Sequence, residues 1–161
     1  MQYDIIHSDP MKYEGCLLAV ENMAVSKQFY TDILHQEIII DLGTYVTFNG
    51  FNLLRGYAEF IGLQAGSEKY RTTNFELYFE VEDLEATRKE LKKNKDLKWV
   101  HDVKEYPWGQ NVIRIYDPDM HIIEISEPMS VVVKRFLEQG RSVEEVAELT
   151  MFPVEFVKQL L

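Results

Sequence analysis

The chain has 161 residues, 46% of them hydrophobic and 12% aromatic, which is the size and composition of one globular domain with or without an appendage. Twenty-seven acidic residues against 17 basic ones give a formal net charge of -10; this repels phosphate backbones, so we expect no nucleic-acid partner. The one cysteine, Cys16, excludes an intrachain disulfide, and no apolar run reaches the ~20 residues of a membrane helix. We therefore expect a cytoplasmic protein without a membrane partner, in which the acidic charge can serve solubility alone.

The first part of the chain predicts a strand, a helix and three further strands. The apolar run from Gly15 to Val20 is typical of a buried strand, and Asn22 is a good N-cap for an amphipathic helix over 23–34. The three short strands that follow are predicted over 37–41, 44–48 and 51–54. Asn49-Gly50 is a two-residue hairpin turn, and 55–72 predicts an extension of the fourth strand and then a crossover loop.

The same order of elements recurs 61 residues later. At this offset Val20-Glu21-Asn22-Met23 aligns with Val81-Glu82-Asp83-Leu84, so Asp83 becomes the second N-cap. The elements predicted here are a strand over 75–81, a helix ending near Asn94, and strands over 97–103, 110–116 and 122–126. The β-α-β-β-β order thus occurs twice, which indicates an internal duplication.

Residues 129–161 predict three short helices, the second opened by the capping-box pattern Ser142-Val143-Glu144-Glu145 and the third by Pro153. The expected organisation is a domain over 1–128, with modules about 13–64 and 73–128, and a tail over 129–161. The tail resembles a helix-turn-helix, but its last helix offers only Lys158 and Gln159 to DNA. We therefore prefer a docking or dimer-forming appendage. Its buried surface would come from Phe136, Leu137, Phe156, Leu160 and Leu161.

Alternation along the strands of the second module separates an apolar face from a polar one. Leu77, Phe79 and Val81 fall on the side that a helix must cover. The opposite face then carries Glu76, Tyr78, Arg114 and Glu124, and Gln110 shares the face of Arg114. A polar sheet face is often only a solvated one. The mixture of carboxylates, Arg114 and aromatic rings, including Trp108, favours a pocket wall instead.

Three segments near the end of the second module resemble the closing stretch of the vicinal-oxygen-chelate superfamily of glyoxalase, bleomycin-resistance and extradiol dioxygenase proteins. They are Pro107-Trp108-Gly109-Gln110, Arg114-Ile115-Tyr116-Asp117-Pro118-Asp119 and His121-Ile122-Ile123-Glu124. The opening, Ala19 to Met23 and Phe29 to Leu34, resembles the first strand and helix of that superfamily. The resemblance covers about 13–128. It implies an α+β fold in which the two βαβββ modules form one cup-shaped, eight-stranded mixed sheet, a small-molecule ligand and a homodimer.

Metal enzymes of this superfamily hold a divalent ion with four strand positions, usually His and Glu. By resemblance Glu76 and Glu124 fall on two of them. Gly15 falls on the third and Leu53 or Leu54 on the fourth, and these lack ligand atoms. Two carboxylates and water can hold Mg²⁺ or Mn²⁺ loosely. Alternatively, Glu76 and Glu124 pair with Arg114 in a metal-free site for a polar or charged ligand.

Two functions remain open at this point. In the first, the protein is a lyase or isomerase of the glyoxalase type, with Glu124 as metal ligand or general base, Glu76 as its partner and Arg114 as a clamp on developing negative charge. In the second, it is a non-catalytic, bleomycin-resistance-like protein that sequesters an antibiotic or another flat ligand. Its stacking walls would be Tyr78, Trp108 and Tyr45.

Three further residues have unremarkable expected roles. His101, two positions after Trp99, could face the pocket, but a surface position is preferred; His121, in the Asp-Pro-Asp turn, is expected to be partly exposed. Cys16 alternates with Gly15 and so faces the predicted helix, which predicts an inert core thiol rather than a nucleophile.

Overall fold

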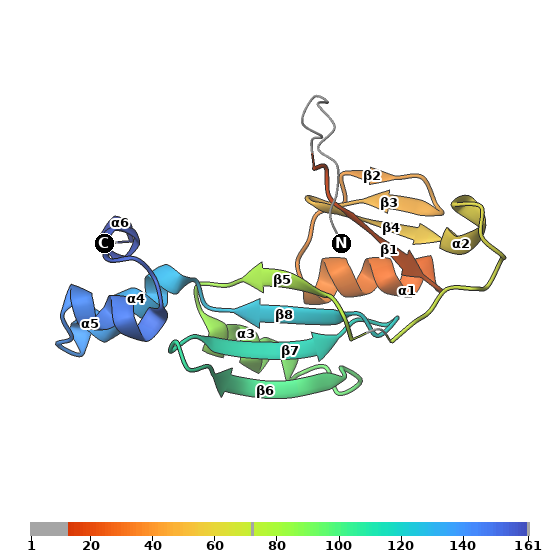
Figure 1. The fold of residues 1–161 in the computed structure, drawn as a ribbon. Coiled ribbons are helices and arrows are strands. Elements are labelled where there is room, and N and C mark those ends of the chain that lie inside the picture. Colours follow the sequence, from red (N-terminus) through yellow and green to blue (C-terminus); the bar gives the residue numbers. More distant parts are fainter. Residues whose placement is uncertain (1–12, 72, 161) are drawn as a thin grey trace, which may run out of the picture. The chain divides into compact units, whose positions relative to one another are not determined.

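The computed structural model describes residues 13–71 and 73–160, and the chain divides after Glu68 into two compact units. Each unit carries one module of the predicted β-α-β-β-β order (Figure 1). The predicted α+β fold, with two tandem modules and helices at the C-terminal end, is confirmed. The first twelve residues of the expected 1–128 domain lie outside the described residues.

The first unit forms a four-stranded sheet of order β1-β4-β3-β2, in which β1 runs parallel to β4 and the other pairs are antiparallel. Its elements are β1 (Cys16–Val20), α1 (Met23–Gln28), a π-helical turn (Phe29–Ile33), β2 (Ile40–Asp41), β3 (Tyr45–Thr47), β4 (Phe51–Arg55) and α2 (Tyr57–Phe60). The predicted N-cap is confirmed, because the Asn22 side-chain oxygen accepts hydrogen bonds from the backbone N–H groups of Ala24 at 3.1 Å and Val25 at 3.3 Å.

Two expectations for the first unit were wrong. The strand expected over 37–41 is only the two-residue β2, and the stretch expected to extend the fourth strand instead contains α2. The left-handed backbone of Gly56, with φ of 73°, ends β4 and starts this short helix. The backbone N–H of Ala58 donates to Glu68 Oε1 at 2.9 Å, which satisfies a donor that a helix N-terminus leaves without an intrahelical partner.

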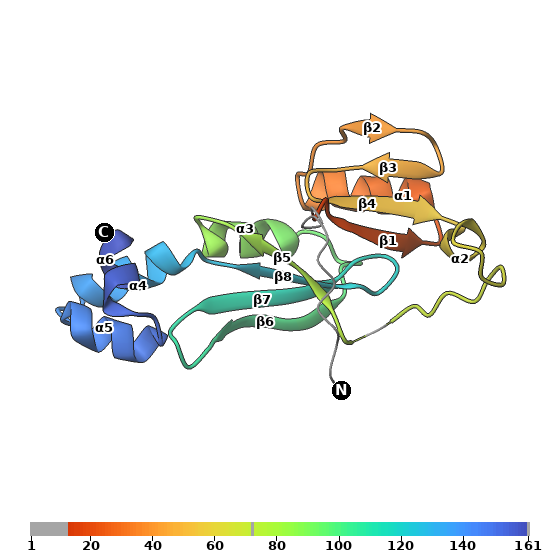
Figure 2. The same ribbon diagram turned by 45° about the horizontal axis from the view of Figure 1, so that its top comes forward.

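The second unit forms a sheet of order β5-β8-β7-β6, with β5 parallel to β8. Its elements are β5 (Glu76–Glu80), α3 (Leu84–Leu91), β6 (Trp99–Glu105), β7 (Asn111–Tyr116) and β8 (Ile122–Ser126). Asp83 caps α3 as predicted, accepting from the Ala86 N–H at 2.8 Å. The helix covers one face of the sheet (Figure 2). The eight strands of the two modules are thus hydrogen-bonded as two four-stranded sheets rather than one eight-stranded sheet.

Alternation divides the second sheet into a buried and a polar face. Ile113 and Ile115 of β7 and Ile123 and Ile125 of β8 are at most 2% exposed. Residues between these isoleucines therefore point to the opposite face of the sheet. The polar face described below is a direct consequence of this apolar packing.

The three predicted helices of the tail are confirmed as α4 (Met129–Glu138), α5 (Val143–Thr150) and α6 (Val154–Gln159). The capping box is present, with Ser142 Oγ accepting from the Glu145 N–H and the Glu145 carboxylate accepting from the Ser142 N–H. The helices enclose a small core of their own. Its buried members are Val133, Val146, Ala147 and Val157. Phe136, Leu137 and Leu160 pack against it as expected, whereas Phe156 is 39% exposed and Leu161 lies outside the described residues.

No helix in the described part of the chain is long and apolar enough to cross a membrane.

Candidate functional site

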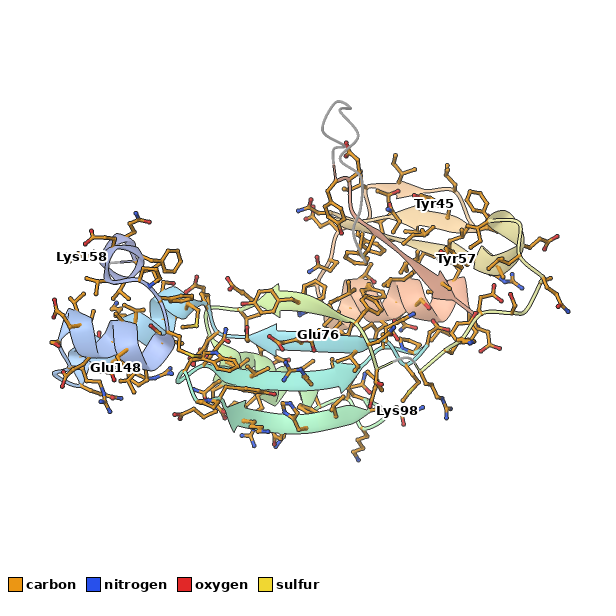
Figure 3. The ribbon with its side chains drawn as sticks, in the orientation of Figure 1. Tyr45, Tyr57, Glu76, Lys98, Glu148 and Lys158 are labelled. Carbon is orange, nitrogen blue, oxygen red and sulfur yellow. The ribbon has the colours of Figure 1, made fainter. Side chains whose placement is uncertain are left out.

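Four residues form one row across the polar face of the second sheet. His101 of β6 pairs with Arg114 of β7, Arg114 pairs with Glu124 of β8, and Glu124 pairs with Tyr78 of β5. Paired residues of neighbouring strands point to the same face. Glu76, which Figure 3 labels on this sheet, is two residues before Tyr78 and so shares the face.

The guanidinium of Arg114 joins the two glutamates that the sequence singled out. Arg114 Nε donates to Glu76 Oε2 at 2.8 Å and Nη2 donates to Glu76 Oε1 at 3.3 Å, a two-pronged pairing. The same Nη2 also donates to Glu124 Oε2. Arg114 is 18% exposed and Glu124 9%, whereas Glu76 is 38% exposed. The structure therefore brings Glu76, Arg114 and Glu124 together, with Glu124 the most deeply placed.

The remaining donors of Arg114 are also engaged. Its Nη1 donates to the Tyr106 hydroxyl and to His101 Nε2, the latter at 3.3 Å. A guanidinium has five N–H groups, and Arg114 has five acceptor atoms around it: two from Glu76 and one each from Glu124, Tyr106 and His101. Arg114 thus holds protein groups in place with every donor it has.

His101 belongs to this cluster, so the less preferred of its two expected placements, on the pocket face, is the one found. Register shifts in β6, between Trp99 and His101 and again before Lys104, turn the His101 side chain onto the polar face. Its Nδ1 lies 2.8 Å from the Asp102 carbonyl oxygen, which can only accept, while Arg114 can only donate. The ring proton is therefore assigned to Nδ1, leaving Nε2 as the acceptor for Arg114.

Two aromatic residues of the segment between β6 and β7, Tyr106 and Trp108, adjoin this row at Arg114 and Gln110. The rings of Tyr106 and Trp108 are 4.9 Å apart, and Arg114 Cζ lies 5.2 Å from the Tyr106 ring centre. Trp108 Nε1 donates to Gln110 Oε1 at 2.9 Å, and Gln110 Nε2 donates to Ser126 Oγ at 3.2 Å. Trp108 and Gln110 were both expected here, whereas Tyr106 was not singled out from the sequence.

Tyr78 stands on the edge strand β5 and is 52% exposed. Its hydroxyl donates to Glu80 Oε1 at 2.5 Å. Partial burial, followed by this hydrogen bond, raises the pKa of Tyr78 above its ordinary value. The phenol is therefore held in its neutral form, as a flat ring at the rim of the face.

The polar face is richer in acceptors than in donors. It carries three carboxylates, from Glu76, Glu80 and Glu124, against two cations, Arg114 and a Lys104 ammonium 5.2 Å from the Tyr106 ring centre, which leaves an excess of one negative charge. Such a surface suits a ligand that donates hydrogen bonds or carries positive charge, and it disfavours an anion.

A second ion pair, not anticipated from the sequence, lies where the sheet meets α4. Glu127 is 6% exposed and accepts from Arg135 Nη1 at 2.7 Å and from the Asn111 N–H at 2.7 Å. Burial by itself raises the pKa of Glu127, but the hydrogen bonds from Arg135 and Asn111 outweigh burial and lower it. The available sequence signal was an acidic residue before Pro128 and a basic one two helical turns later.

The residues of the second unit do not fit a divalent metal ion. Within 13–71 and 73–160, no group of three or more His, Cys, Asp or Glu side chains is arranged to hold one. Glu76 and Glu124, the expected ligands, are instead both bonded to Arg114. A metal ion at these carboxylates would have to displace a cation that already neutralises part of their charge.

The matching positions of the first unit do not supply the missing ligands. Gly15 has φ of +136°, and a Cβ there would lie 2.6 Å from the Gly50 carbonyl oxygen, so no side chain fits. Leu17 matches Tyr78 at the 61-residue offset and pairs with Asn52 as Tyr78 pairs with Glu124, so the residue that corresponds to Glu124 is Asn52 rather than Leu53 or Leu54. Leu53 is fully buried. We therefore derive no chemical step through a metal.

Three other residues were given roles from the sequence, two in the first unit and one in the turn before β8. Tyr45 is on β3 of the first unit (Figure 3), and its part in the same site remains a prediction. Burial raises the pKa of the Cys16 thiol, in keeping with an inert thiol. His121 was expected to be partly exposed but is only 7% exposed, because its Nδ1 lies 2.8 Å from Asp117 Oδ2 within the turn.

Comparisons with known sequences and with known structures agree on the fold of this chain. The sequence profile of the glyoxalase-like domain matches residues 13–130. The structure is similar to a protein of unknown function from Agrobacterium tumefaciens str. C58, with 33% sequence identity over 76% of this chain and 98% of that chain and a TM-score of 0.68.

Two more distant structures show the fold alone. A lactoylglutathione lyase from Agrobacterium tumefaciens is 18% identical, with a TM-score of 0.57 over 74% of this chain and 96% of its own. A glyoxalase/bleomycin resistance protein/dioxygenase family enzyme from Burkholderia phytofirmans PsJN is 16% identical, with a TM-score of 0.63 over 73% of this chain and 98% of its own. No curated protein matches the chain.

Proposed function

This chain belongs to the glyoxalase-like domain family, and from that premise we propose that it binds a small oxygenated molecule on the polar face of its second sheet, without a metal ion. The observation that supports this most directly is the engagement of all five Arg114 N–H groups by Glu76, Glu124, Tyr106 and His101. Because Arg114 has no N–H group left to donate to a ligand, the site favours a neutral or cationic ligand over an anion.

The ligand would meet acceptors and flat rings. A carboxylate has about four acceptor positions. Glu76 and Glu124 therefore keep capacity beyond their bonds to Arg114. The rings of Tyr78 and Trp108 offer apolar faces beside them. We infer a small, flat molecule whose hydroxyl or amino groups donate to these carboxylates. In this view Arg114 positions the glutamates and does not itself clamp developing negative charge.

A metal-dependent lyase or isomerase is the second candidate. It has the support of a structural relative that is named a lactoylglutathione lyase, and of two glutamates whose carboxylates share one partner. In that case Glu124 would serve as metal ligand or general base, and Arg114 would have to release it. The first candidate is preferred because it uses the contacts of Arg114 as they stand.

Metal content separates the two candidates. Plasma mass spectrometry of the purified protein is expected to find no stoichiometric divalent metal in wild type or in Glu124→Gln. The matched control is Glu82→Gln, which removes an exposed carboxylate from the same unit. A stoichiometric metal that is present in wild type and Glu82→Gln but lost in Glu124→Gln would overturn the metal-free proposal and establish the metal-dependent one.

Ligand class is tested next by thermal stabilisation, because a compound that binds only the folded state raises the unfolding temperature. Catechol, a flat vicinal diol, is expected to stabilise wild type and Glu82→Gln in the presence of a chelator. Benzoate, a flat anion, is expected not to, and Glu124→Gln is expected to lose the response to catechol. Stabilisation by benzoate alone, or by catechol only without the chelator, would contradict the proposal.

A further inference from the structure

The turn over 106–110 lies between the candidate site and the helical tail. It is closed by two backbone hydrogen bonds, from the Tyr106 N–H to the Gln110 carbonyl at 2.9 Å and from the Gly109 N–H to the Tyr106 carbonyl at 2.8 Å. One side of the turn presents the Tyr106 and Trp108 rings, and the Tyr106 hydroxyl accepts from Arg114. The position of this turn therefore sets the position of two aromatic walls.

The other side of the turn is in contact with α4. Gly109 is buried and has φ of +83°, and a Cβ on it would lie 2.2 Å from Phe136 Cζ and 3.3 Å from Val132 Cγ1. Only glycine combines this backbone conformation with so close an approach. The Phe136 ring thus rests directly on the backbone of the turn.

Arg135, the neighbour of Phe136 on α4, ties the same turn to the sheet. Its Nη1 donates to Glu127 Oε2 at 2.7 Å, and its Nη2 donates to Glu127 Oε1 at 2.9 Å and to the Gly109 carbonyl oxygen. Glu127 Oε1 also accepts from Asn111, the first residue of β7, through its N–H at 2.7 Å and its Nδ2 at 3.0 Å. One guanidinium therefore fixes the helix, the turn and the strand that carries Arg114.

Hydrogen bonds connect Arg135 of α4 to Trp108 of the turn through Glu127 and Gln110. Glu127 also accepts, at its backbone carbonyl, a hydrogen bond of 2.9 Å from Gln110 Nε2, and Gln110 in turn accepts from Trp108. Arg135 and Phe136 lie beyond residue 130, where the similarity to the glyoxalase-like domain ends. The helix that holds the turn is therefore an addition to the shared fold.

We propose that α4 is a positioning element of the candidate site, in which Arg135 and Phe136 fix the 106–110 turn and thereby set the placement of Tyr106 and Trp108 beside Arg114. The effect of this positioning on ligand binding rests on the proposed function. The positioning of the turn by α4 does not rest on it, because it is a property of the protein without ligand. Arg135 acts through the turn and is a positioning residue rather than one that touches the ligand.

The two tryptophans allow a local test. Trp108 is in the turn, while Trp99 is at the start of β6, away from the Arg135 contacts. In a Trp99→Phe background only Trp108 emits, and in a Trp108→Phe background only Trp99 does. Arg135→Ala is expected to shift Trp108 emission to longer wavelength and to increase its quenching by acrylamide, while Trp99 emission stays unchanged.

Two further variants serve as controls. Lys134→Ala removes a neighbouring, exposed cation from the same helix and is expected to change neither tryptophan. Arg135→Lys is expected to recover part of the Trp108 signal, because an ammonium can pair with Glu127 but cannot make the two-pronged bond. If Arg135→Ala does not fold, Glu127→Gln weakens the same pair and is measured in its place.

The outcomes separate this inference from the proposed function. Unchanged Trp108 emission in Arg135→Ala, or equal shifts of Trp108 and Trp99, would overturn local positioning. A Trp108 shift without binding of catechol would uphold positioning and reject the proposed ligand class. Where catechol binds, Arg135→Ala is expected to weaken its binding while Lys134→Ala does not, and equal affinity in both variants would overturn the effect on the site.

Discussion

The two modules share an architecture but differ on one face of their sheets. Each begins with a strand that runs parallel to the last strand of its module, followed by a helix capped by Asn22 in one and Asp83 in the other. At the 61-residue offset Gly15 of the first module corresponds to Glu76 of the second. Asn52 corresponds to Glu124 through strand register, because Leu17 pairs with Asn52 as its counterpart Tyr78 pairs with Glu124. The features that build the fold have been kept, and those that build the charged cluster are present once.

The central residue of the cluster shows the same contrast. Thr47 pairs with Asn52 in the first sheet, as Arg114 pairs with Glu124 in the second. The short hydroxyl side chain of Thr47 thus occupies the position that corresponds to Arg114. The Arg114 guanidinium binds groups from β5, β6 and β8 and from the turn after β6. The helix-covered face of a duplicated sheet is constrained by packing, whereas the other face is free to change. This difference supports placing the proposed ligand site in the second module.

The largest expected effect is on Arg114. Arg114→Met keeps an unbranched apolar side chain but leaves Glu76 and Glu124 without their shared cation. We expect a loss of about 3 kcal/mol in the free energy of unfolding at neutral pH, at the lower end for a broken buried ion pair because Glu76 reaches solvent. Urea denaturation measures the loss. Thr47→Val at the matching position should cost under about 1 kcal/mol, and similar losses in both variants would contradict the comparison.

A smaller effect is expected at Gly15. Gly15→Ala places a Cβ 2.6 Å from the Gly50 carbonyl oxygen at φ of +136°, so we expect a loss of about 2 kcal/mol in the free energy of unfolding. Gly43→Ala is the matched control, because Gly43 also has positive φ, +82°, but no atom within 4 Å of the added Cβ. It should cost about 1 kcal/mol. Equal losses in guanidinium denaturation would show that backbone conformation, and not the Gly50 contact, excludes a side chain.

The smallest expected effect is the pH dependence that Glu127 contributes in the second module. The pKa of Glu127 is lowered in the folded state, so its contribution to stability is present above the ordinary glutamate pKa of about 4.3 and is lost as pH falls through the lowered value. Glu127→Gln should be less stable than wild type at neutral pH, and the two should converge on acidification. The first module has Arg55, not a carboxylate, at the corresponding position.

Thermal unfolding followed from pH 7 to pH 3 tests this prediction. Glu144→Gln, which removes an exposed carboxylate from α5, should follow the wild-type curve. A constant difference between wild type and Glu127→Gln at every pH would mean that packing, and not charge, is what Glu127 contributes.

Most of the fold followed from local sequence signals. The caps at Asn22 and Asp83, the hairpin turn before Phe51 and the alternation along β5 and β8 each depend on a few neighbouring residues, and each was predicted correctly. The short α2 escaped prediction because a single left-handed Gly56 ends β4, and glycine in a sequence does not reveal the sign of its φ.

The two glutamates, Arg114 and their pairing were predictable as one of two alternatives, but the other contacts of Arg114 were not. Alternation placed Glu76, Arg114 and Glu124 on one face, yet it could not show that Arg114 uses all its donors within the protein. The pocket face was not the preferred placement of His101, because two register shifts in β6 break the alternation on which the prediction depended. Arg135 was missed because its role depends on the docking of α4 on the turn at Gly109, which no local pattern encodes.

Gly15 also limits what this protein can become. A donor at position 15 would first require the hairpin at Gly50 to move, since its carbonyl occupies the space of a Cβ. A ligand at position 15 therefore takes two coupled changes, one that moves the Gly50 carbonyl and one that adds the side chain.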